Sequence, residues 1–597
     1  MRDSTAFLVA ALLARAAPAI ATPSPVQVGW TTDFGSVYGS THSRANFGPD
    51  GPWQAIELSV GNVSTQQTAF GSGGPGISMP LYPCGSSLTQ VLPPATGADY
   101  SYNQSSTARL PGIQLGNPDD WSASVFANST SIGVEVFDLV TLPLKLANLA
   151  SFSANATVFQ PTDWTIPRPD GSNYTTEVGI FGLGSDTYNA RTGGILEQMK
   201  NAEVINSHSF GLHIGSAPLN VTGSLILGGF DSSRALGQVG VFQYLMDMPV
   251  GVLRDVKLGV EEGGSPFDPA STGSLYQVNN VSDAVTVAAQ TFGAPRGTVL
   301  VIPNPAAPYI YLPYGTCEAV AQFLPVSWNA HAGLYTWNTT DPQYPRIVNS
   351  PAYLEFILAD KLATNISIKV PFKLLNLTLE SPIVDTPTAY FPCKPFNSTY
   401  GFYGLGRAFL QAAFLAVNYD QNLTFLAQAP GPDLDQSVLQ TIKPSDTNLT
   451  SNPIASFRNS WTNHWTVLPT TNSPSNRNTG LSSGAKAGIA LGALAAFALL
   501  LLGLLFLLRR MKRNNASRED PQQRRPLADE IDGFETPGVS ELHGPHGVSD
   551  MSKPLAHEMG AGHGVSDLSR PLAHEMEAGH GLHEAPSHHG GPGRRAG

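Results

Sequence analysis

The chain has 597 residues, enough for several domains, and a hydrophobic content of 42% supplies a large core. Charged residues make up only 13% of it and the net charge at pH 7 is −12, with no basic stripe in the main body, which argues against nucleic acid as a partner. Three cysteines, Cys84, Cys317 and Cys393, are too few for a disulfide scaffold, and one pair with one further cysteine is the simplest arrangement in an oxidising compartment.

The first 21 residues have the pattern of a secretory signal peptide. Arg2 precedes an apolar run over residues 6–13, and Ala19-Ile20-Ala21 forms a small-residue cleavage site that ends at residue 21. The apolar run is too short to span a bilayer. Residues 22–45 then form a polar lead-in.

The next part of the chain predicts a mostly β ectodomain. Residues 53–60 (WQAIELSV) alternate apolar and polar side chains, as a half-buried strand does. Residues 224–227 and 409–417 are further expected strands, and turn residues separate many such runs. Helical patterns are few, with the best over residues 194–202 and 316–324.

The C-terminal part predicts a membrane anchor. Residues 436–486 are rich in Ser, Thr, Asn and Pro and predict an extended stalk. Residues 487–508 carry no charge and are long enough to span a membrane, and four basic residues follow within residues 509–513. Because basic flanks stay cytoplasmic, we expect the C-terminus inside and the ectodomain at the cell surface, with the plasma membrane as a partner.

The glycosylation sequons agree with this topology. Thirteen Asn-x-Ser/Thr sites precede the predicted span and one, at Asn515, follows it. We therefore expect N-glycosylation at Asn62, Asn103, Asn128, Asn155, Asn173, Asn220, Asn280, Asn338, Asn365, Asn376, Asn397, Asn422 and Asn448.

The predicted cytoplasmic tail, residues 509–597, contains a 17-residue repeat. Residues 546–562 (HGVSDMSKPLAHEMGAG) return as residues 563–579 (HGVSDLSRPLAHEMEAG). A unit this polar cannot bury a core, so we expect a disordered, low-complexity tail. The repeats are suited to docking a cytosolic partner, and we favour this soluble tail over a metal site built from its histidines.

One glycine pattern looks like a nucleotide-binding loop and is not one. Gly71, Gly73 and Gly76 match G-x-G-x-x-G, which needs a helix immediately after it. Pro80 and Pro83 prevent a helix of useful length there. We therefore expect no nucleotide cofactor, and no other cofactor or metal ion.

The chain resembles the pepsin-like aspartic peptidases over roughly residues 45–430. Residues 56–84 resemble the first active-site loop with its flanking strands. Residues 178–184 (VGIFGLG), 223–231 (GSLILGGFD) and 404–410 (GLGRAFL) are similar to three later family segments and occur in the family order. The resemblance, to a membrane-anchored fungal-type member, implies a bilobal fold with lobes over residues 46–240 and 241–435.

The resemblance also implies that the catalytic residues are lost. The family uses two aspartates that face each other between the lobes. The alignment places Gly71 and Asn304 at these positions, Ser72 and Pro305 at the hydroxyl positions after them, and Phe126 at the tyrosine of the flap. Glycine has no side chain and asparagine cannot ionise, so neither can exchange a proton.

Two further segments look like active-site loops but are poorly placed. Asp33 lies close to the mature N-terminus, with no apolar strand after it, and Asp385 lies too near the end of the second lobe. The resemblance puts Cys317 and Cys393 together in the second lobe, and we expect them to form the disulfide.

These patterns lead to three hypotheses. The first is a catalytically inactive, aspartic-peptidase-like surface glycoprotein whose inter-lobe cleft binds an extended peptide or a cell-wall polymer. The second is an active membrane-anchored aspartic endopeptidase that uses Asp33 or Asp385. The third is a structural or adhesive surface glycoprotein.

Overall fold

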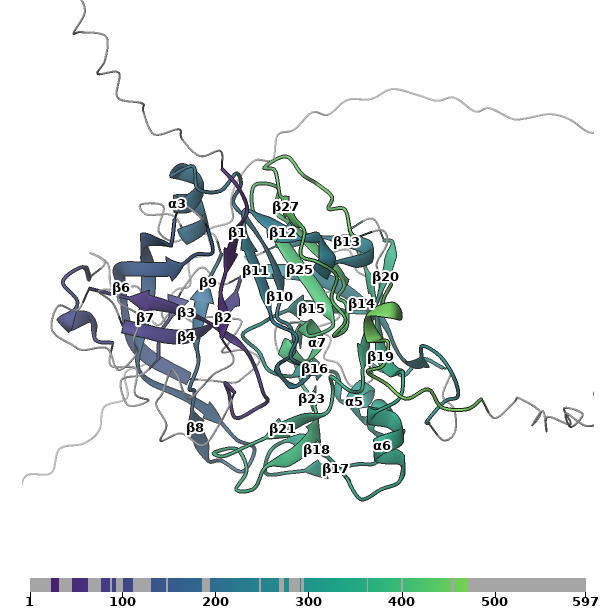
Figure 1. Ribbon diagram of the computed structural model, residues 1–597. Coiled ribbons are helices and arrows are strands. Elements are labelled where there is room, and N and C mark those ends of the chain that lie inside the picture. The colour runs from purple at the N-terminus through teal and green to yellow at the C-terminus, as the bar shows by residue number, and fades with distance from the viewer. Residues whose placement is uncertain are drawn as a thin grey trace, which may run out of the picture. The chain divides into compact units, whose positions relative to one another are not determined.

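Strands dominate the computed structural model, and its helices are short (Figure 1). The structure describes residues 23–31, 46–62, 77–85, 89–92, 100–110, 130–146, 149–184, 194–245, 248–267, 273–278, 290, 295–361, 363–398, 401–452 and 456–470. All of them belong to one compact unit, Met1–Gly480. The prediction of a mostly β fold is confirmed.

Several predicted segments lie outside the described residues. They are the signal peptide over 1–21, most of the lead-in over 22–45, the span over 487–508 and the tail over 509–597. Among the residues that the structure describes, no helix has the length and apolar character needed to cross a membrane.

The first half of the body forms an eight-stranded sheet in which β3 pairs with both β4 and β6, so that the sheet closes on itself. Ile56, Leu58 and Val60 are buried on one face of β3, which matches the predicted alternation. The strands are β2 (Trp30–Thr31), β3 (Ala55–Val60), β4 (Ile77–Cys84), β5 (Thr89–Gln90), β6 (Thr130–Pro143), β7 (Ser151–Pro167), β8 (Asn173–Thr175) and β9 (Gly179–Gly182).

A thirteen-stranded sheet runs through the second half of the body and also takes strands from the first. Its central strands β25 and β26 are buried along their whole length, as their nearly continuous apolar sequences require. The strands are β1 (Val26–Val28), β10 (Ser209–His213), β11 (Ser224–Leu227), β13 (Leu236–Leu245), β14 (Met248–Val260), β15 (Val299–Pro303), β16 (Ile310–Leu312), β19 (Ala352–Ala359), β20 (Asn365–Pro371), β23 (Cys393–Pro395), β24 (Phe402–Leu405), β25 (Ala413–Asn418) and β26 (Leu423–Gln428).

A small sheet and short helices complete the second half. The sheet contains β17 (Val326–Asn329), β18 (Leu334–Trp337), β21 (Leu377–Leu379) and β22 (Thr388–Phe391). The α-helices are α3 (Ile195–Asn201), α5 (Tyr314–Ala321), α6 (Gln343–Val348) and α7 (Arg407–Leu410). Single 3₁₀ turns are η2 (Tyr102–Gln104), η3 (Ala217–Leu219), η4 (Ser232–Arg234) and η5 (Asn459–Trp461).

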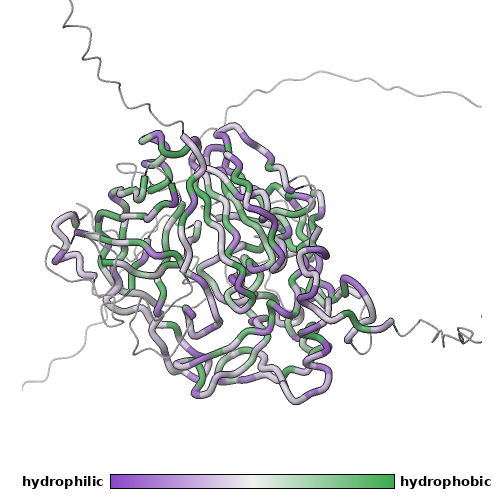
Figure 2. Tube along the Cα trace, viewed as in Figure 1, coloured by the Kyte–Doolittle hydropathy of each residue, from purple (hydrophilic) through white to green (hydrophobic). Residues whose placement is uncertain are grey.

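The helices and strands differ from the sequence predictions mainly in their ends. Helices α3 and α5 correspond to the two predicted helices. The strand predicted over residues 409–417 is divided, because α7 takes its first residues and β25 begins at Ala413. Figure 2 shows apolar residues along the packed strands and hydrophilic residues in many of the connecting loops.

The chain after β26 packs against the body, where the composition of residues 436–486 predicts an extended stalk. β27 (Leu439–Thr441) pairs with β12 (Gly229–Asp231), and Ile442 is fully buried. Trp461 is also buried and stacks on Trp465, with ring centroids 5.5 Å apart. These isolated apolar residues anchor a polar segment, which average composition does not reveal.

One disulfide joins helix α5 to strand β23. It connects Cys317 to Cys393, whose Cα atoms lie 5.7 Å apart, and it confirms the predicted pair. Cys84 lies elsewhere, buried at the end of β4.

Candidate functional site

One arrangement of four strands occurs twice in the body. β4 runs parallel to β9, while β5 lies antiparallel to β9 and parallel to β7. In the same way, β15 runs parallel to β24, while β16 lies antiparallel to β24 and parallel to β23. Each predicted lobe therefore contains one copy.

The strand registers show which residues are equivalent in the two copies. Cys84, the last residue of β4, pairs with Gly182. The last residue of β15 pairs with Leu405, so Asn304, which follows β15, stands opposite Gly406. Gly182 and Gly406 each follow a bulky apolar residue of the matching strand. Cys84 and Asn304 thus occupy corresponding positions.

The sequence contains a signal for this equivalence that the predictions missed. A proline immediately precedes both Cys84 and Asn304, and a Leu-Pro pair begins eight residues after each of them, at Leu92 and Leu312. The prediction instead placed Gly71 opposite Asn304. Gly71 and Ser72, like Phe126 and Asp33, lie outside the described residues. Within the described residues, Cys84 holds the place that corresponds to Asn304.

The two equivalent residues are buried close to the junction of the copies. The Asn304 side chain is 3% exposed, and its Oδ1 accepts a hydrogen bond of 2.9 Å from the backbone N–H of Ala306. Cys84 packs with Trp164 and Ile180, and Ala306 packs against this group. The loop after Asn304 therefore reaches the end of β4, and neither equivalent residue carries a carboxyl group.

Asp385 does not lie at a comparable position. It is exposed on a bend between β21 and β22 and does not follow the end of a parallel strand. It cannot supply a buried acid at the junction of the two copies.

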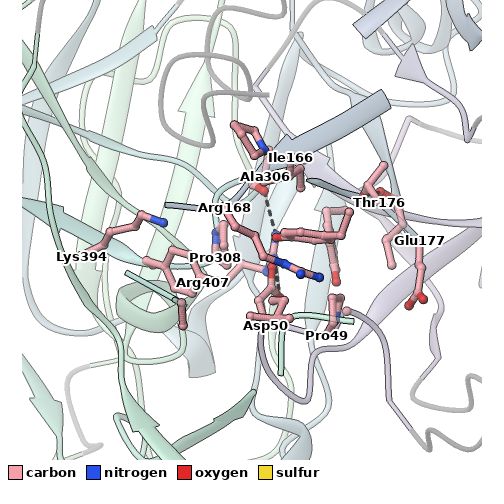
Figure 3. Close-up of a pocket in the computed structure, with 18 of the residues that line it drawn as sticks. Pro49, Asp50, Ile166, Arg168, Thr176, Glu177, Ala306, Pro308, Lys394 and Arg407 are labelled. Carbon is pink, nitrogen blue, oxygen red and sulfur yellow. Dashed lines mark hydrogen bonds and ion pairs between the residues drawn. The ribbon is translucent and has the colours of Figure 1, made fainter. Parts of the chain in front are cut away.

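A pocket opens beside the two loops and is lined by both predicted lobes (Figure 3). Its empty volume, which includes the part open to solvent, is about 850 Å³. The first lobe contributes Tyr82, Trp164, Ile166, Arg168, Tyr174, Glu177 and Ile180 together with Asp50, and the second contributes Ala306, Pro308, Tyr309, Tyr311, Ile383, Lys394 and Arg407.

A buried ion pair lies at one wall of this pocket. Nη2 of Arg407 donates to both carboxylate oxygens of Asp50, at 3.2 and 3.4 Å. Trp53 Nε1 donates to the same carboxylate at 2.7 Å. Nη1 of Arg407 donates to the carbonyl oxygens of Pro305 (3.1 Å) and Ala306 (2.8 Å), so this side chain ties the loop after Asn304 to the N-terminal segment.

Lys394 from β23 supplies a second cation. Its Nζ lies 5.0 Å from the ring centroid of Tyr309. Burial lowers the pKa of Lys394 to about 8, and the negative charge of Asp50 opposes this shift. Among the described residues, no carboxylate forms an ion pair with Lys394.

The aromatic walls of the pocket stay neutral. Burial raises the pKa values of Tyr174 and Tyr309 well above the ordinary value for tyrosine, and Asp50 adds to both shifts. Burial acts in the same way on Tyr311. These side chains therefore offer apolar ring faces and protonated hydroxyl groups.

No protein-family model matches the chain, and no curated protein matches it. The interpretation of this site therefore depends on its geometry and on its residue chemistry.

Proposed function

We propose that this protein is a catalytically inactive member of the pepsin-like aspartic peptidases that binds a ligand between its two lobes. The duplicated arrangement of parallel strands supports the bilobal fold. One observation carries the loss of activity: the equivalent strand ends carry Cys84 and Asn304, where a proton-sharing pair of carboxyl groups would be needed.

The chemistry of these residues supports the same conclusion. An aspartic peptidase needs one carboxylate to activate water and one carboxylic acid to donate a proton. Asn304 cannot ionise, and its Oδ1 is already engaged with the backbone of its own loop. Asp50, a buried acid that lines the pocket, is held by Arg407 and Trp53.

Binding without catalysis fits the other features of the site. The pocket draws side chains from both halves, is rich in aromatic residues and contains a few charged groups, as ligand pockets commonly do. We propose that it receives part of an extended peptide or polymer at the cell surface.

A surface location is supported by the predicted glycosylation sites. Asn128 and Asn280 lie outside the described residues, and none of the other eleven asparagines is buried. Asn62 and Asn376 are partly exposed, and the remaining nine are exposed. Acceptor asparagines must be accessible, so this distribution agrees with a glycosylated ectodomain.

A cleavage assay tests the proposal. The purified full-length protein is incubated with denatured casein between about pH 3 and pH 6, with and without pepstatin, and pepsin serves as the positive control. We expect no pepstatin-sensitive cleavage, because each missing acid–base group costs about 10²–10⁴-fold in rate. Cleavage that pepstatin abolishes would overturn the proposal.

A further inference from the structure

The charged side chains of the pocket are unequally compensated. Three cationic and two acidic residues line it. Asp50 and Arg407 pair with each other, and Arg168 donates to the Ser172 hydroxyl at 2.9 Å and lies over the Tyr174 ring. Neither Arg168 nor Lys394 forms an ion pair with a carboxylate of the described residues, but Arg168 is held by these hydrogen-bond and ring contacts, whereas Lys394 has the ring of Tyr309 beside it.

Lys394 is also directed toward the pocket. In Figure 3 its ammonium end points toward the other lining residues, while Glu177 lies on the opposite side of the group. The ring of Tyr309 covers one side of the ammonium at 5.0 Å. A cation that is partly desolvated and faces a cavity favours an anion as its ligand.

The walls indicate what the rest of the ligand is like. Trp164, Ile166, Ile180 and Ile383 offer apolar surface. The polar group of Thr176 is already used, since its hydroxyl donates to a backbone carbonyl at 3.1 Å. These particular side chains cannot replace the hydrogen bonds to water that a polar group would lose against them, so this part of the pocket suits an apolar body.

We propose that the pocket binds an organic anion in which a single carboxylate is attached to an apolar or aromatic body, with Lys394 Nζ as its counter-charge. This inference rests on the proposed function, because it takes the inter-lobe pocket as the binding site. Two sources share the chemistry: a free aromatic acid and the C-terminal carboxylate of a peptide that ends in an aromatic residue.

Titration calorimetry on the full-length protein near neutral pH tests the inference. One pair of probes is 3-phenylpropionate and its amide, and the other is the peptide Ala-Ala-Ala-Phe with a free or an amidated C-terminus. We expect each acid to bind at least about tenfold more tightly than its amide, as a charge-assisted hydrogen bond implies. Tighter binding of the peptide acid than of phenylpropionate identifies the peptide as the source, and the reverse identifies the free acid.

Lys394→Met should abolish the preference for the acid, and Lys394→Arg should retain it. Lys443→Met is the matched control, because Lys443 is exposed and does not line the pocket. The comparison of acid and amide on the unaltered protein needs no variant, so a folding defect cannot obscure the result.

Three results would overturn the inference: equal binding of acid and amide, an undiminished preference in Lys394→Met, or no binding of either acid. The outcome remains distinct from that of the proposed function. One further outcome is that the amidated peptide or a neutral β-glucan oligosaccharide binds as well as the acids or better. That result would support the proposed non-catalytic binding function and would contradict the preference for an anion.

Discussion

Arg407 donates hydrogen bonds to the carboxylate of Asp50, a residue 357 positions earlier in the chain. The guanidinium also lies over the ring of Tyr82, 3.9 Å from its centroid, and binds two carbonyl oxygens of the loop after Asn304. A single side chain thus joins the start of the body to the loop that follows Asn304. The arrangement is sensitive to the loss of either charge, since the other would remain buried without compensation.

Removing one partner of this pair should destabilise the fold strongly. We expect Arg407→Met and Asp50→Asn each to lower the free energy of unfolding by about 3–5 kcal/mol, and the double variant to lose less than the sum. Urea unfolding measures these differences. Arg458→Met is the control, because its exposed pair with Glu262 should contribute less than about 1 kcal/mol. A loss below about 1 kcal/mol in Arg407→Met would contradict the expectation.

The disulfide should make a comparable contribution. Cys317 and Cys393 are 76 residues apart, so their bond restricts a long loop in the unfolded chain. We expect replacement of both by serine to lower the free energy of unfolding by about 2–5 kcal/mol. The unaltered protein should also release a single titratable thiol, that of Cys84, when it is denatured without reductant; three thiols would refute the pairing.

The aromatic anchor at the end of the body should be essential for stability. Trp461 is 1% exposed and stacks on Trp465, whose indole N–H donates to Glu262 at 3.2 Å. Trp461→Ala should lower the free energy of unfolding by about 3–5 kcal/mol, as other large core truncations do. Trp328 is 47% exposed and provides the control, with an expected change within about 1 kcal/mol. A loss within about 1 kcal/mol in Trp461→Ala, as small as that expected for the control, would show that residues 456–470 are not anchored.

Lys394 should give the protein a distinct pH dependence. Its pKa is about 8 in the folded protein, whereas an unfolded lysine titrates near 10.4. Between these values the unfolded chain binds more protons, so stability from this residue rises as pH increases through the window and is at its lowest below pH 8.

The difference between the unaltered protein and Lys394→Met isolates this effect. The groups that interact with Lys394, namely Asp50 and Tyr309, are the same in both proteins. We expect the unfolding free energy of the unaltered protein to increase relative to the variant between about pH 7.5 and pH 10. A difference that stays constant over this range would rule out the lowered pKa.

Sequence patterns predicted the strands well where one face is buried, as in β3, and the distance to Leu312-Pro313 was the reason for selecting Asn304 as a candidate. They did not identify Cys84, because a glycine-rich segment before β4 also matched the turn expected at the catalytic loop. The registers of β4 and β15 show that Cys84 and Asn304 are equivalent. Such long-range strand pairing cannot be read from any single segment of the sequence.

The pocket was harder to predict for a related reason. Asp50 lies far from Lys394 and Arg407 in the sequence, and only tertiary packing brings the three residues to the same cavity. An extended stalk is not observed over residues 439–442. Composition averages over a window, whereas a paired strand and the buried Ile442 directly after it determine the local structure.

The first and last strands of the body attach to neighbouring parts of the chain. β1 pairs with β11, and β27 pairs with β12, which begins two residues after β11 ends. β10, the other neighbour of β11, pairs with β25, roughly 200 residues further along. A nascent chain therefore presents unpaired strand edges for most of its synthesis, and these edges invite pairing with other chains. We expect shielding of those edges until β27 has been made to protect the nascent chain from such pairing.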